Sequence, residues 1–243
     1  MTTRDFLKTR LDPGQRYGLR LTLLVLAVLL VAIPFGLLLR EVTQHGPMTH
    51  LDTAAARNLH EHVRGSPALV RFLQGVSFLG SPVWFYIVTT IAAVWVWRQG
   101  HSRLALFLVV TGILGGVIDS IVKILVDRPR PSLEQPVATA HGKSFPSGHS
   151  MSSVVGYGAL LLVFLPVIEK RWRVTVISAT ALLVVAIGFT RLALGVHYIS
   201  DVLGGFALGL AWLTASTAAF SIWRVERGKP KVEPAEGLAP EAL

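Results

Sequence analysis

Long apolar segments separated by short polar connections constrain this chain more than any other feature of its sequence. Six of them are long enough to cross a bilayer core, which is about 30 Å thick and needs about 20 mostly apolar residues. Because backbone hydrogen bonds in lipid must be satisfied within the segment, each is expected to be helical. The sequence therefore predicts an all-α, polytopic membrane protein with a six-transmembrane-helix bundle. The expected spans are Leu21–Leu39, Ser77–Trp97, Leu104–Val122, Ser150–Ile168, Val174–Thr190 and Val202–Trp223.

Composition agrees with this fold class and excludes several functions. The 243 residues are 52% hydrophobic and only 15% charged, whereas about a quarter of a soluble domain is charged. A net charge of +9 suits nucleic acid or an anionic membrane, and the apolar segments favour the membrane, so no nucleic acid partner is expected. With no cysteine in the chain, disulfides, thiolate metal sites and cysteine-nucleophile phosphatases are excluded.

The distribution of lysine and arginine predicts the orientation in the membrane. One set of connections, which includes both ends of the chain, carries 14 of the 23 basic residues, and the more basic side is normally cytoplasmic. Both termini are therefore expected in the cytoplasm. The expected parts are a cytoplasmic N-terminal segment (1–18), one membrane domain (19–224) and a disordered, proline-containing cytoplasmic tail (225–243).

Two glycine pairs indicate where helices could pack closely. Gly112 and Gly116 lie in the third segment and Gly205 and Gly209 in the sixth, and both pairs have the G-x-x-x-G spacing that allows two helix backbones to approach. Chance spacing in a glycine-rich chain is the alternative.

The outer connection from residue 42 to 74 is long for this chain. Leu51, Ala55, Leu59 and Val63 recur within it at helical spacing, which predicts a short helix on the membrane surface. Such a helix could cover the lipid entrance, or it could be a solvated connector. His60 and His62 would diverge on a helix, so no metal site is expected there.

Polar residues gather in three stretches at the outer ends of the last four segments. The first runs from Lys123 to Pro131 and follows the third segment. The second, Pro146-Ser147-Gly148-His149, precedes the fourth segment. The third begins with Thr190 and Arg191 at the end of the fifth segment and continues to His197 and Asp201 at the start of the sixth.

The basic residues of these stretches suit a phosphate group. Lys123, Arg130 and Arg191 together would more than match a phosphate dianion, and arginine binds phosphate oxygens through two donors. Gly148 would let backbone N–H groups at the start of a helix approach an oxyanion. Ser147 could cap that helix or donate its hydroxyl to the same anion.

The histidines suit covalent catalysis. His197 and Asp201 are four residues apart and share a face if the sixth helix already includes both; the carboxylate would fix the tautomer and leave the other ring nitrogen as a nucleophile. His149 could be the general acid for the leaving group. No carboxylate cluster accompanies them, so no metal or other cofactor is expected. Asp119, one turn before Lys123, is expected to pair with it.

Taken singly, these residues have ordinary explanations: headgroup anchors, interfacial histidines or a turn before a helix. Together, Lys123-x6-Arg130-Pro131, Pro146-Ser147-Gly148-His149 and Arg191-x5-His197-x3-Asp201 resemble the three signature motifs of the type 2 phosphatidic acid phosphatase superfamily. That superfamily includes integral-membrane lipid phosphatases and, more distantly, vanadium haloperoxidases and glucose-6-phosphatase. Thr190 stands where the third motif commonly has serine, which retains the hydroxyl.

The resemblance implies roles for the same residues. His197 would attack phosphorus and form a phosphohistidine, and Asp201 would orient it. His149 would protonate the departing oxygen and then activate water. The phosphoryl oxygens would be held, without a metal, by Lys123, Arg130, Ser147, Gly148 and Arg191.

The sequence thus predicts a metal-independent lipid phosphatase in the cell membrane, with its site on the extracytoplasmic side. The resemblance suggests undecaprenyl diphosphate, phosphatidylglycerophosphate or phosphatidic acid as the substrate, and the outward-facing site favours the first. One alternative is a catalytically silent lipid-binding or lipid-translocating protein, which has no need for two histidines and an aspartate. Another is haloperoxidase chemistry, which membrane embedding disfavours. The sequence does not fix an oligomeric state.

Overall fold

The computed structural model describes residues 19–44, 46–226 and 237–238 of the chain. These residues form α-helices and one 3-10 helix, and no strand is present among them, which confirms the all-α prediction for this part of the chain. The predicted segment 1–18 and most of the predicted tail 225–243 lie outside the described residues. The helices are α2 (Leu19–Thr43), α3 (Met48–Arg64), α4 (Pro67–Phe78), α5 (Pro82–Arg98), α6 (Ser102–Val126), α7 (Gly148–Phe164), the 3-10 helix Leu165–Val167, α8 (Lys170–Ala193) and α9 (Ile199–Glu226).

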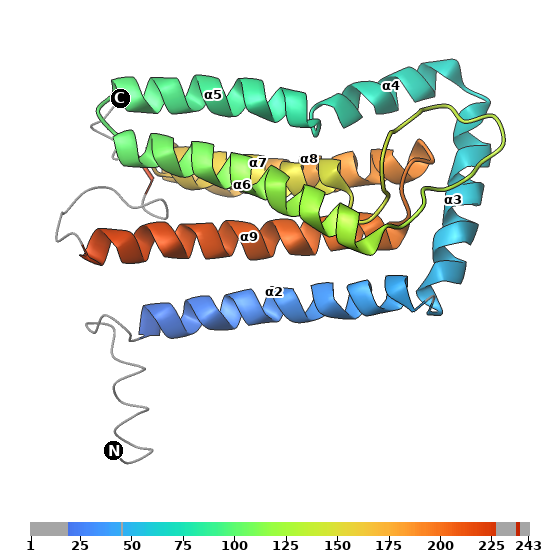
Figure 1. Ribbon diagram of the computed structural model, residues 1–243. Helices are drawn as coiled ribbons and strands as arrows, with labels where there is room; N and C mark the ends of the chain where they lie inside the picture. Colours follow the sequence, from blue (N-terminus) through green and yellow to red (C-terminus); the bar gives the residue numbers. More distant parts are fainter. Residues whose placement is uncertain (1–18, 45, 227–236, 239–243) are drawn as a thin grey trace, which may run out of the picture.

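Most of the helices run along one common direction (Figure 1). Four of those in the described residues, α6, α7 with its 3-10 extension, α8 and α9, are long and apolar enough to cross a membrane, and the pair α4–α5 is a fifth candidate. The 25 residues of α2 span about 37 Å at 1.5 Å per residue, which also exceeds a bilayer core. A multi-span membrane fold is therefore confirmed, and the sixth span and the cytoplasmic side of the termini stay predictions.

The segment predicted as one span, Ser77–Trp97, is divided in the structure. The axes of α4 and α5 differ by 41° across a short break. Ser81 caps α5 by accepting a hydrogen bond from a backbone amide of its first turn, and Pro82 follows at a position where no N–H is needed. The serine–proline pair therefore starts a new helix within an apolar stretch whose hydropathy alone predicts continuity.

The backbone between α4 and α5 is held in place by α7. The Tyr157 hydroxyl donates to the Leu79 carbonyl at 2.9 Å, and the Ser152 hydroxyl donates to the Gly80 carbonyl at 2.9 Å. A Cβ at Gly80 would lie 2.3 Å from Cγ2 of Ile187 on α8, so the corner approaches α8 only because the residue is glycine. The carbonyl groups freed by the break are thus satisfied, as buried backbone requires.

α3 lies across one end of the bundle (Figure 1). The predicted helix in the outer connection therefore exists, and its apolar residue Leu51 is 62% exposed, so another face is turned toward the bundle. Polar anchors decide this orientation: Nε2 of His60 lies 2.8 Å from the carbonyl oxygen of Glu134, and Asp52 bonds to α9. The buried residues of α3 are Asp52, Ala56, His60 and Val63.

α7 contacts α5, α6, α8 and α9, and its contact with α9 depends on glycine. A Cβ at Gly205 would lie 2.6 Å from the carbonyl oxygen of Ser147, and one at Gly209 would lie 3.0 Å from that of Met151. Real side chains do not fit at the shorter of these distances. Close packing is therefore confirmed for the glycine pair of the sixth predicted segment.

The glycine pair of α6 does not pack against a helix backbone, so that prediction was wrong. A Cβ at Gly112 would meet nothing within 4 Å, and one at Gly116 would meet only the Tyr86 hydroxyl, at 3.6 Å. The glycine of α6 in close contact is Gly115, whose Cβ would lie 3.2 Å from the ring of Trp212 on α9. Gly112 and Gly116 instead line a groove that is described below.

The largest apolar core lies at the end of the bundle away from α3. Leu238, from the short described part of the tail, is fully buried there, and its N–H donates to the Val163 carbonyl at 2.8 Å. This end is thus closed by ordinary packing, which leaves the polar chemistry to the opposite end. The buried residues of this core include Val96, Leu104, Phe107, Leu108, Ala159 and Val163.

Candidate active site

His197 lies in the turn between α8 and α9. α9 begins two residues after it, so His197 and Asp201 do not share a helical face as their spacing alone suggested. Asp201 nevertheless reaches back from the first turn of α9, and its Oδ2 lies 3.4 Å from Nδ1 of His197. The same oxygen accepts the backbone N–H of Tyr198 at 2.8 Å. The carboxylate therefore holds the turn and the histidine at once.

The contacts of His197 define its tautomer. Nη1 of Arg130 lies 3.0 Å from Nε2 of the imidazole, and a guanidinium can only donate, so Nε2 accepts and Nδ1 carries the proton toward Asp201. Burial lowers the pKa of His197 to about 4; the Asp201 carboxylate opposes this shift, and the charges of Arg130 and Arg191 add to it. At neutral pH the ring is therefore uncharged, with a lone pair on Nε2.

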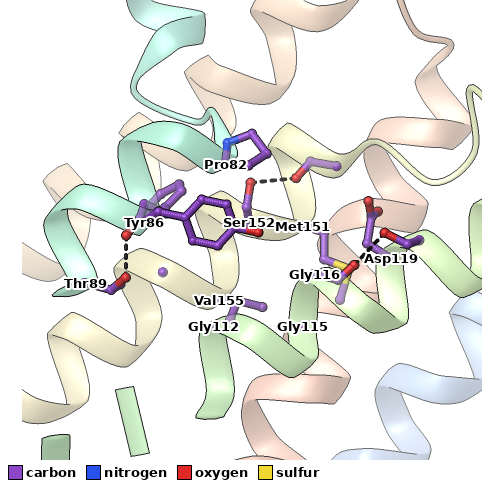
Figure 2. Close-up of a pocket in the computed structure, with 14 residues that line it drawn as sticks. Pro82, Tyr86, Thr89, Gly112, Gly115, Gly116, Asp119, Met151, Ser152 and Val155 are labelled. Atoms are coloured by element: carbon purple, nitrogen blue, oxygen red, sulfur yellow. Dashed lines mark hydrogen bonds between the residues drawn. The ribbon is translucent and has the colours of Figure 1, made fainter. Parts of the chain in front are cut away.

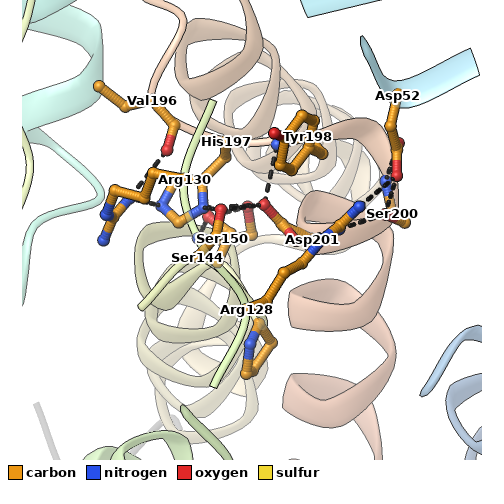
Figure 3. A network of polar contacts seen from close by, with 12 residues as sticks. Asp52, Arg128, Arg130, Ser144, Ser150, Val196, His197, Tyr198, Ser200 and Asp201 are labelled. Atoms are coloured by element: carbon orange, nitrogen blue, oxygen red, sulfur yellow. Dashed lines mark hydrogen bonds and ion pairs between the residues drawn. The ribbon is translucent and has the colours of Figure 1, made fainter. Parts of the chain in front are cut away.

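Asp201 is fixed by donors on both oxygens (Figure 3). Its Oδ1 accepts from Nη1 of Arg128 at 2.6 Å, and its Oδ2 accepts from the Ser144 hydroxyl at 2.5 Å in addition to Tyr198. The residue is fully buried. A buried carboxylate with this many donors is held in one orientation, and that orientation presents Oδ2 to the His197 ring.

Arg130 joins the α6–α7 connection to the turn that carries His197. Its Nε donates to the Gly142 carbonyl and its Nη2 to the His141 carbonyl, both at 3.0 Å, and its Nη1 donates to the Val196 carbonyl at 2.8 Å. Because the guanidinium is fixed by backbone oxygens from two loops, its position beside Nε2 of His197 does not depend on a bound ligand.

Lys123, near the end of α6, forms the predicted pair with Asp119. Its ammonium lies 2.7 Å from both carboxylate oxygens and donates to the Pro146 carbonyl at 2.6 Å. A Cβ at Gly148 would lie 3.0 Å from Oδ2 of Asp119 and 3.3 Å from Nζ of Lys123. The missing side chain therefore lets the lysine reach the start of α7.

The start of α7 presents backbone N–H groups and His149. The Ser147 hydroxyl accepts from the Ser150 hydroxyl at 3.0 Å and from its N–H at 3.5 Å, so of the two predicted roles for Ser147 the structure contains the cap. Among the residues that the structure describes, none hydrogen-bonds the His149 ring. The charged and titratable groups that act on that ring electrostatically are Arg191, His197, Lys123 and Arg130.

Arg191, near the end of α8, is buried and held by α4. Its Nη1 donates to the Ser77 hydroxyl at 2.5 Å, and its Nε has no hydrogen-bond partner among the described residues. The hydroxyl of Thr190, the one departure from the motif, donates to the Ile187 carbonyl of its own helix at 2.6 Å. The last turn of α4 thus supplies the serine that orients this arginine.

The structure brings all eight predicted residues to one end of the bundle, and their roles stay predictions. The sequence missed Ser144 and Ser77, which hold Asp201 and Arg191. Ser77 lies at the start of a predicted apolar span, and the only sequence signal at Ser144 is its position three residues before Ser147. Arg128 also holds Asp201, and its sequence signal is the repeated pair Arg128-Pro129-Arg130-Pro131. The eight residues are Lys123, Arg130, Ser147, Gly148, His149, Arg191, His197 and Asp201.

The positive charges of this site belong to arginine and lysine side chains. Among the described residues there is no group of three or more His, Asp or Glu side chains placed to hold a metal ion. Two imidazoles, an oriented carboxylate and three cations thus lie together at one end of a multi-span helical fold, an arrangement suited to binding a phosphate group.

Comparisons with known proteins specify the family. Residues 103–224 match the PAP2 superfamily. The chain is 31% identical over 171 residues to phosphatidylglycerophosphatase B of Bacillus subtilis, covering 66% of this chain and 82% of that protein. The chain belongs to the PAP2 superfamily.

Other relatives agree on the class of enzyme. Over 126 residues the chain is 31% identical to lipid A 1-phosphatase of Rhizobium etli, covering 48% of this chain and 50% of that protein. Also over 126 residues, it is 29% identical to undecaprenyl-diphosphatase BcrC of Bacillus subtilis, covering 49% of this chain and 59% of that protein.

A solved structure agrees as well. The crystal structure of a transmembrane PAP2-type phosphatidylglycerolphosphate phosphatase from Bacillus subtilis superposes with a TM-score of 0.72 at 25% identity, covering 85% of this chain and 99% of that one. These relatives are membrane lipid phosphatases, and the chain is a hydrolase of phosphoric ester bonds.

Proposed function

We propose that the chain hydrolyses the phosphate or diphosphate of a membrane lipid through a phosphohistidine on His197, at the extracytoplasmic face of the cell membrane. The observation that carries the proposal is the state of the His197 ring. Nδ1 is directed to Asp201, and Nε2 is an unprotonated nitrogen 3.0 Å from a guanidinium donor of Arg130. A neutral imidazole with one nitrogen oriented by a carboxylate is an activated nucleophile.

The first step forms the bond between Nε2 of His197 and phosphorus and breaks the bond from phosphorus to the leaving oxygen. A bound phosphate dianion offsets the positive charges of Arg191, Lys123 and Arg130 around His149, so that its ring takes up a proton and gives it to that oxygen, which leaves as a lipid alcohol or lipid monophosphate. The N–H of Arg130 that donates to Nε2 of His197 then donates to a phosphoryl oxygen instead. Lys123 and Arg191 add positive charge where negative charge develops, and Nε of Arg191 is an unused donor for this purpose.

The second step releases phosphate. His149, now neutral, takes a proton from a water molecule, and the water oxygen attacks phosphorus. The bond from phosphorus to Nε2 breaks, so that His197 regains its lone pair and inorganic phosphate leaves. Asp201 remains an anion in both steps and stabilises the imidazolium character of the phosphorylated ring.

A groove between α5, α6 and α7 offers a place for the lipid tail. It has a cavity volume of about 160 Å³ and extends from Asp119 at the polar end toward Tyr86, Gly112 and Val155 (Figure 2). The lining is mostly apolar, and the two α6 glycines that do not pack against a helix widen it. A substrate could thus keep its hydrocarbon in the groove and present its phosphate to the cations.

The substrate belongs to the lipids on which the relatives act. The outward-facing site favours undecaprenyl diphosphate, and the similarity to phosphatidylglycerophosphatase B over most of its length favours phosphatidylglycerophosphate. A panel of these two lipids and phosphatidic acid, each supplied in mixed micelles at matched mole fraction, would rank them by kcat/KM.

The central test is phosphate release by purified protein in mild detergent. We expect the wild type to release inorganic phosphate from at least one lipid of this panel, and His197→Ala to lose at least about a thousandfold in kcat because the nucleophile is gone. His62→Ala is the matched control, since His62 is exposed and bonds only within α3. Binding of these lipids by the wild type without phosphate release would support the lipid-binding or lipid-translocating alternative.

The groove has a test of its own. Gly112→Phe fills space in which no atom lies within 4 Å of a Cβ, so kcat/KM for a long-chain lipid phosphate should fall by about tenfold. A short-chain, water-soluble phosphate ester should be hydrolysed as before. Gly36→Phe on α2, where a Cβ also meets nothing within 4 Å, is the control. Equal loss on both substrates would exclude the groove as the tail site.

A further inference from the structure

Asp52 is a buried carboxylate that the proposed reaction does not yet use. It lies on α3, outside the residues 103–224 that match the superfamily, and is 1% exposed. Its Oδ1 accepts the backbone N–H of Ser200 at 3.0 Å; its Oδ2 accepts the Ser200 hydroxyl at 2.5 Å and Nη2 of Arg128 at 2.8 Å. A buried charge with this set of donors is specifically placed.

Arg128 connects Asp52 to Asp201 (Figure 3). Nη1 of Arg128 donates to Oδ1 of Asp201 at 2.6 Å and to the Ser200 hydroxyl at 2.7 Å, and the guanidinium lies 4.2 Å from the centre of the Tyr198 ring. Burial alone lowers the pKa of Arg128, but Asp201 and Asp52 outweigh it and raise the pKa above its usual value. One guanidinium thus serves two carboxylates, one on α3 and one beside the nucleophile.

The net charge of these three residues indicates how they could assist the reaction at His197. Asp52, Arg128 and Asp201 together carry one net negative charge, which faces the His197 ring through Oδ2 of Asp201. When Nε2 bonds to phosphorus, the ring gains positive character. Without Asp52 the two remaining groups would be neutral in sum, because the positive charge of Arg128 would be matched by the negative charge of Asp201 alone. The field that favours the charged ring would then be weaker.

We propose that Asp52 is a positioning residue for the reaction: through Arg128 it holds Asp201 and leaves the charge of that carboxylate available to His197. This inference rests on the proposed function. It also gives α3 a role other than covering the bundle, because α3 supplies the outermost member of the chain of contacts. Asp52 touches no substrate in this scheme and acts only through Arg128 and Asp201.

The test uses vanadate and phosphate as probes, without turnover. Vanadate forms a five-coordinate adduct with a nucleophile and resembles the transition state, whereas phosphate is held by the cations alone. We expect Asp52→Asn, which keeps the shape of the side chain, to bind vanadate about tenfold more weakly than the wild type, while its affinity for phosphate stays within about twofold. The measurement is calorimetric titration of the detergent-solubilised full chain.

Matched variants separate this role from a structural one. Glu61→Gln removes a charge from an exposed position of the same helix and should leave both affinities unchanged. Ser200→Ala removes the hydroxyl shared by Asp52 and Arg128 and should weaken vanadate binding by a few fold, which keeps the test available if Asp52→Asn does not fold. In kcat, Asp52→Asn combined with Arg128→Gln should be no worse than Arg128→Gln alone, because one residue acts through the other.

The outcomes are distinguishable. Wild-type affinity for vanadate in a folded Asp52→Asn protein overturns the inference and leaves the proposed function standing. Equal weakening of vanadate and phosphate also overturns it, since the whole pocket would then have been disturbed. A wild-type chain that binds neither probe overturns the proposed function itself, and this inference with it.

Discussion

The chemistry of His197 follows from where the ring is buried and which groups contact it. Desolvation keeps the imidazole uncharged, Arg130 occupies Nε2, and Asp201 faces Nδ1. These contacts select one tautomer out of two. In a solvated loop the same histidine would have no fixed tautomer, because no neighbouring group would select which ring nitrogen carries the proton.

The depressed pKa of His197 predicts a pH-dependent contribution to stability. Between about pH 4, its folded value, and 6.5, its ordinary value, the unfolded chain binds a proton that the folded chain does not. The free energy of unfolding therefore rises with pH over this window. The contribution is complete above pH 6.5, and about 3 kcal/mol of it is lost as the pH falls to 4.

Comparison of wild type with His197→Gln measures this contribution. Denaturant unfolding in mild detergent at pH 4.5 and 7.5 should show a smaller loss of stability on acidification for His197→Gln than for the wild type. His62→Gln, at an exposed position of α3, should behave as the wild type. Parallel pH dependence in the wild type and His197→Gln would contradict the buried, uncharged state.

At the scale of the helix, glycines decide which surfaces approach. Gly205 and Gly209 bring α9 against the backbone of α7, where Ser147 and Met151 lie, whereas Gly112 and Gly116 open a groove instead. The spacing of the two pairs is identical, so the motif alone did not distinguish contact from cavity. The difference lies in the neighbouring element: the backbone of α7 faces Gly205 and Gly209, whereas the groove faces Gly112 and Gly116.

Alanine substitutions should separate the two pairs. Gly205→Ala places a Cβ 2.6 Å from the Ser147 carbonyl oxygen, so α7 must shift at the residues that lead into His149. We expect a loss of about 1–3 kcal/mol in stability together with reduced phosphatase activity. Gly112→Ala meets nothing within 4 Å and should change stability by less than about 0.5 kcal/mol. Thermal unfolding in detergent compares the two, and equal destabilisation would contradict the packing described.

At the scale of the whole molecule, the bundle separates packing from chemistry. Apolar contacts around Val96, Phe107 and Leu238 close one end, and buried polar groups occupy the other. Trp97 and Trp172 are exposed at the apolar end, where interfacial tryptophans are expected. This polarity is what the predicted orientation requires, with the polar end facing outward.

The absence of cysteine makes the orientation directly measurable. Lys143→Cys lies at the polar end and Arg171→Cys at the other, and both native side chains are exposed, at 46% and 72%. In intact cells a membrane-impermeant maleimide should label Lys143→Cys and leave Arg171→Cys unlabelled until the cells are permeabilised. The reverse pattern would place the polar end in the cytoplasm. The unsubstituted chain, which has no cysteine, is the blank.

Some features could be predicted from the sequence because they depend on composition and local spacing. Apolar length indicated the membrane helices, since a bilayer demands about 20 such residues, and the three motifs supplied the candidate residues. The pairing of Asp119 with Lys123 followed from one helical turn. The break at Ser81-Pro82 could not be predicted from hydropathy, because these residues do not make the segment polar, although a serine followed by proline is a signal for the start of a helix.

The tertiary structure decided everything that joins distant segments. Asp52 reaches Arg128 and Ser200 across more than seventy positions of the chain, and Ser77 reaches Arg191 across more than a hundred. Such contacts depend on how α3 and α4 fold over the end of the bundle. No local pattern encodes that arrangement, because the hydrogen bonds that fix it form only when buried polar groups from separate helices satisfy one another.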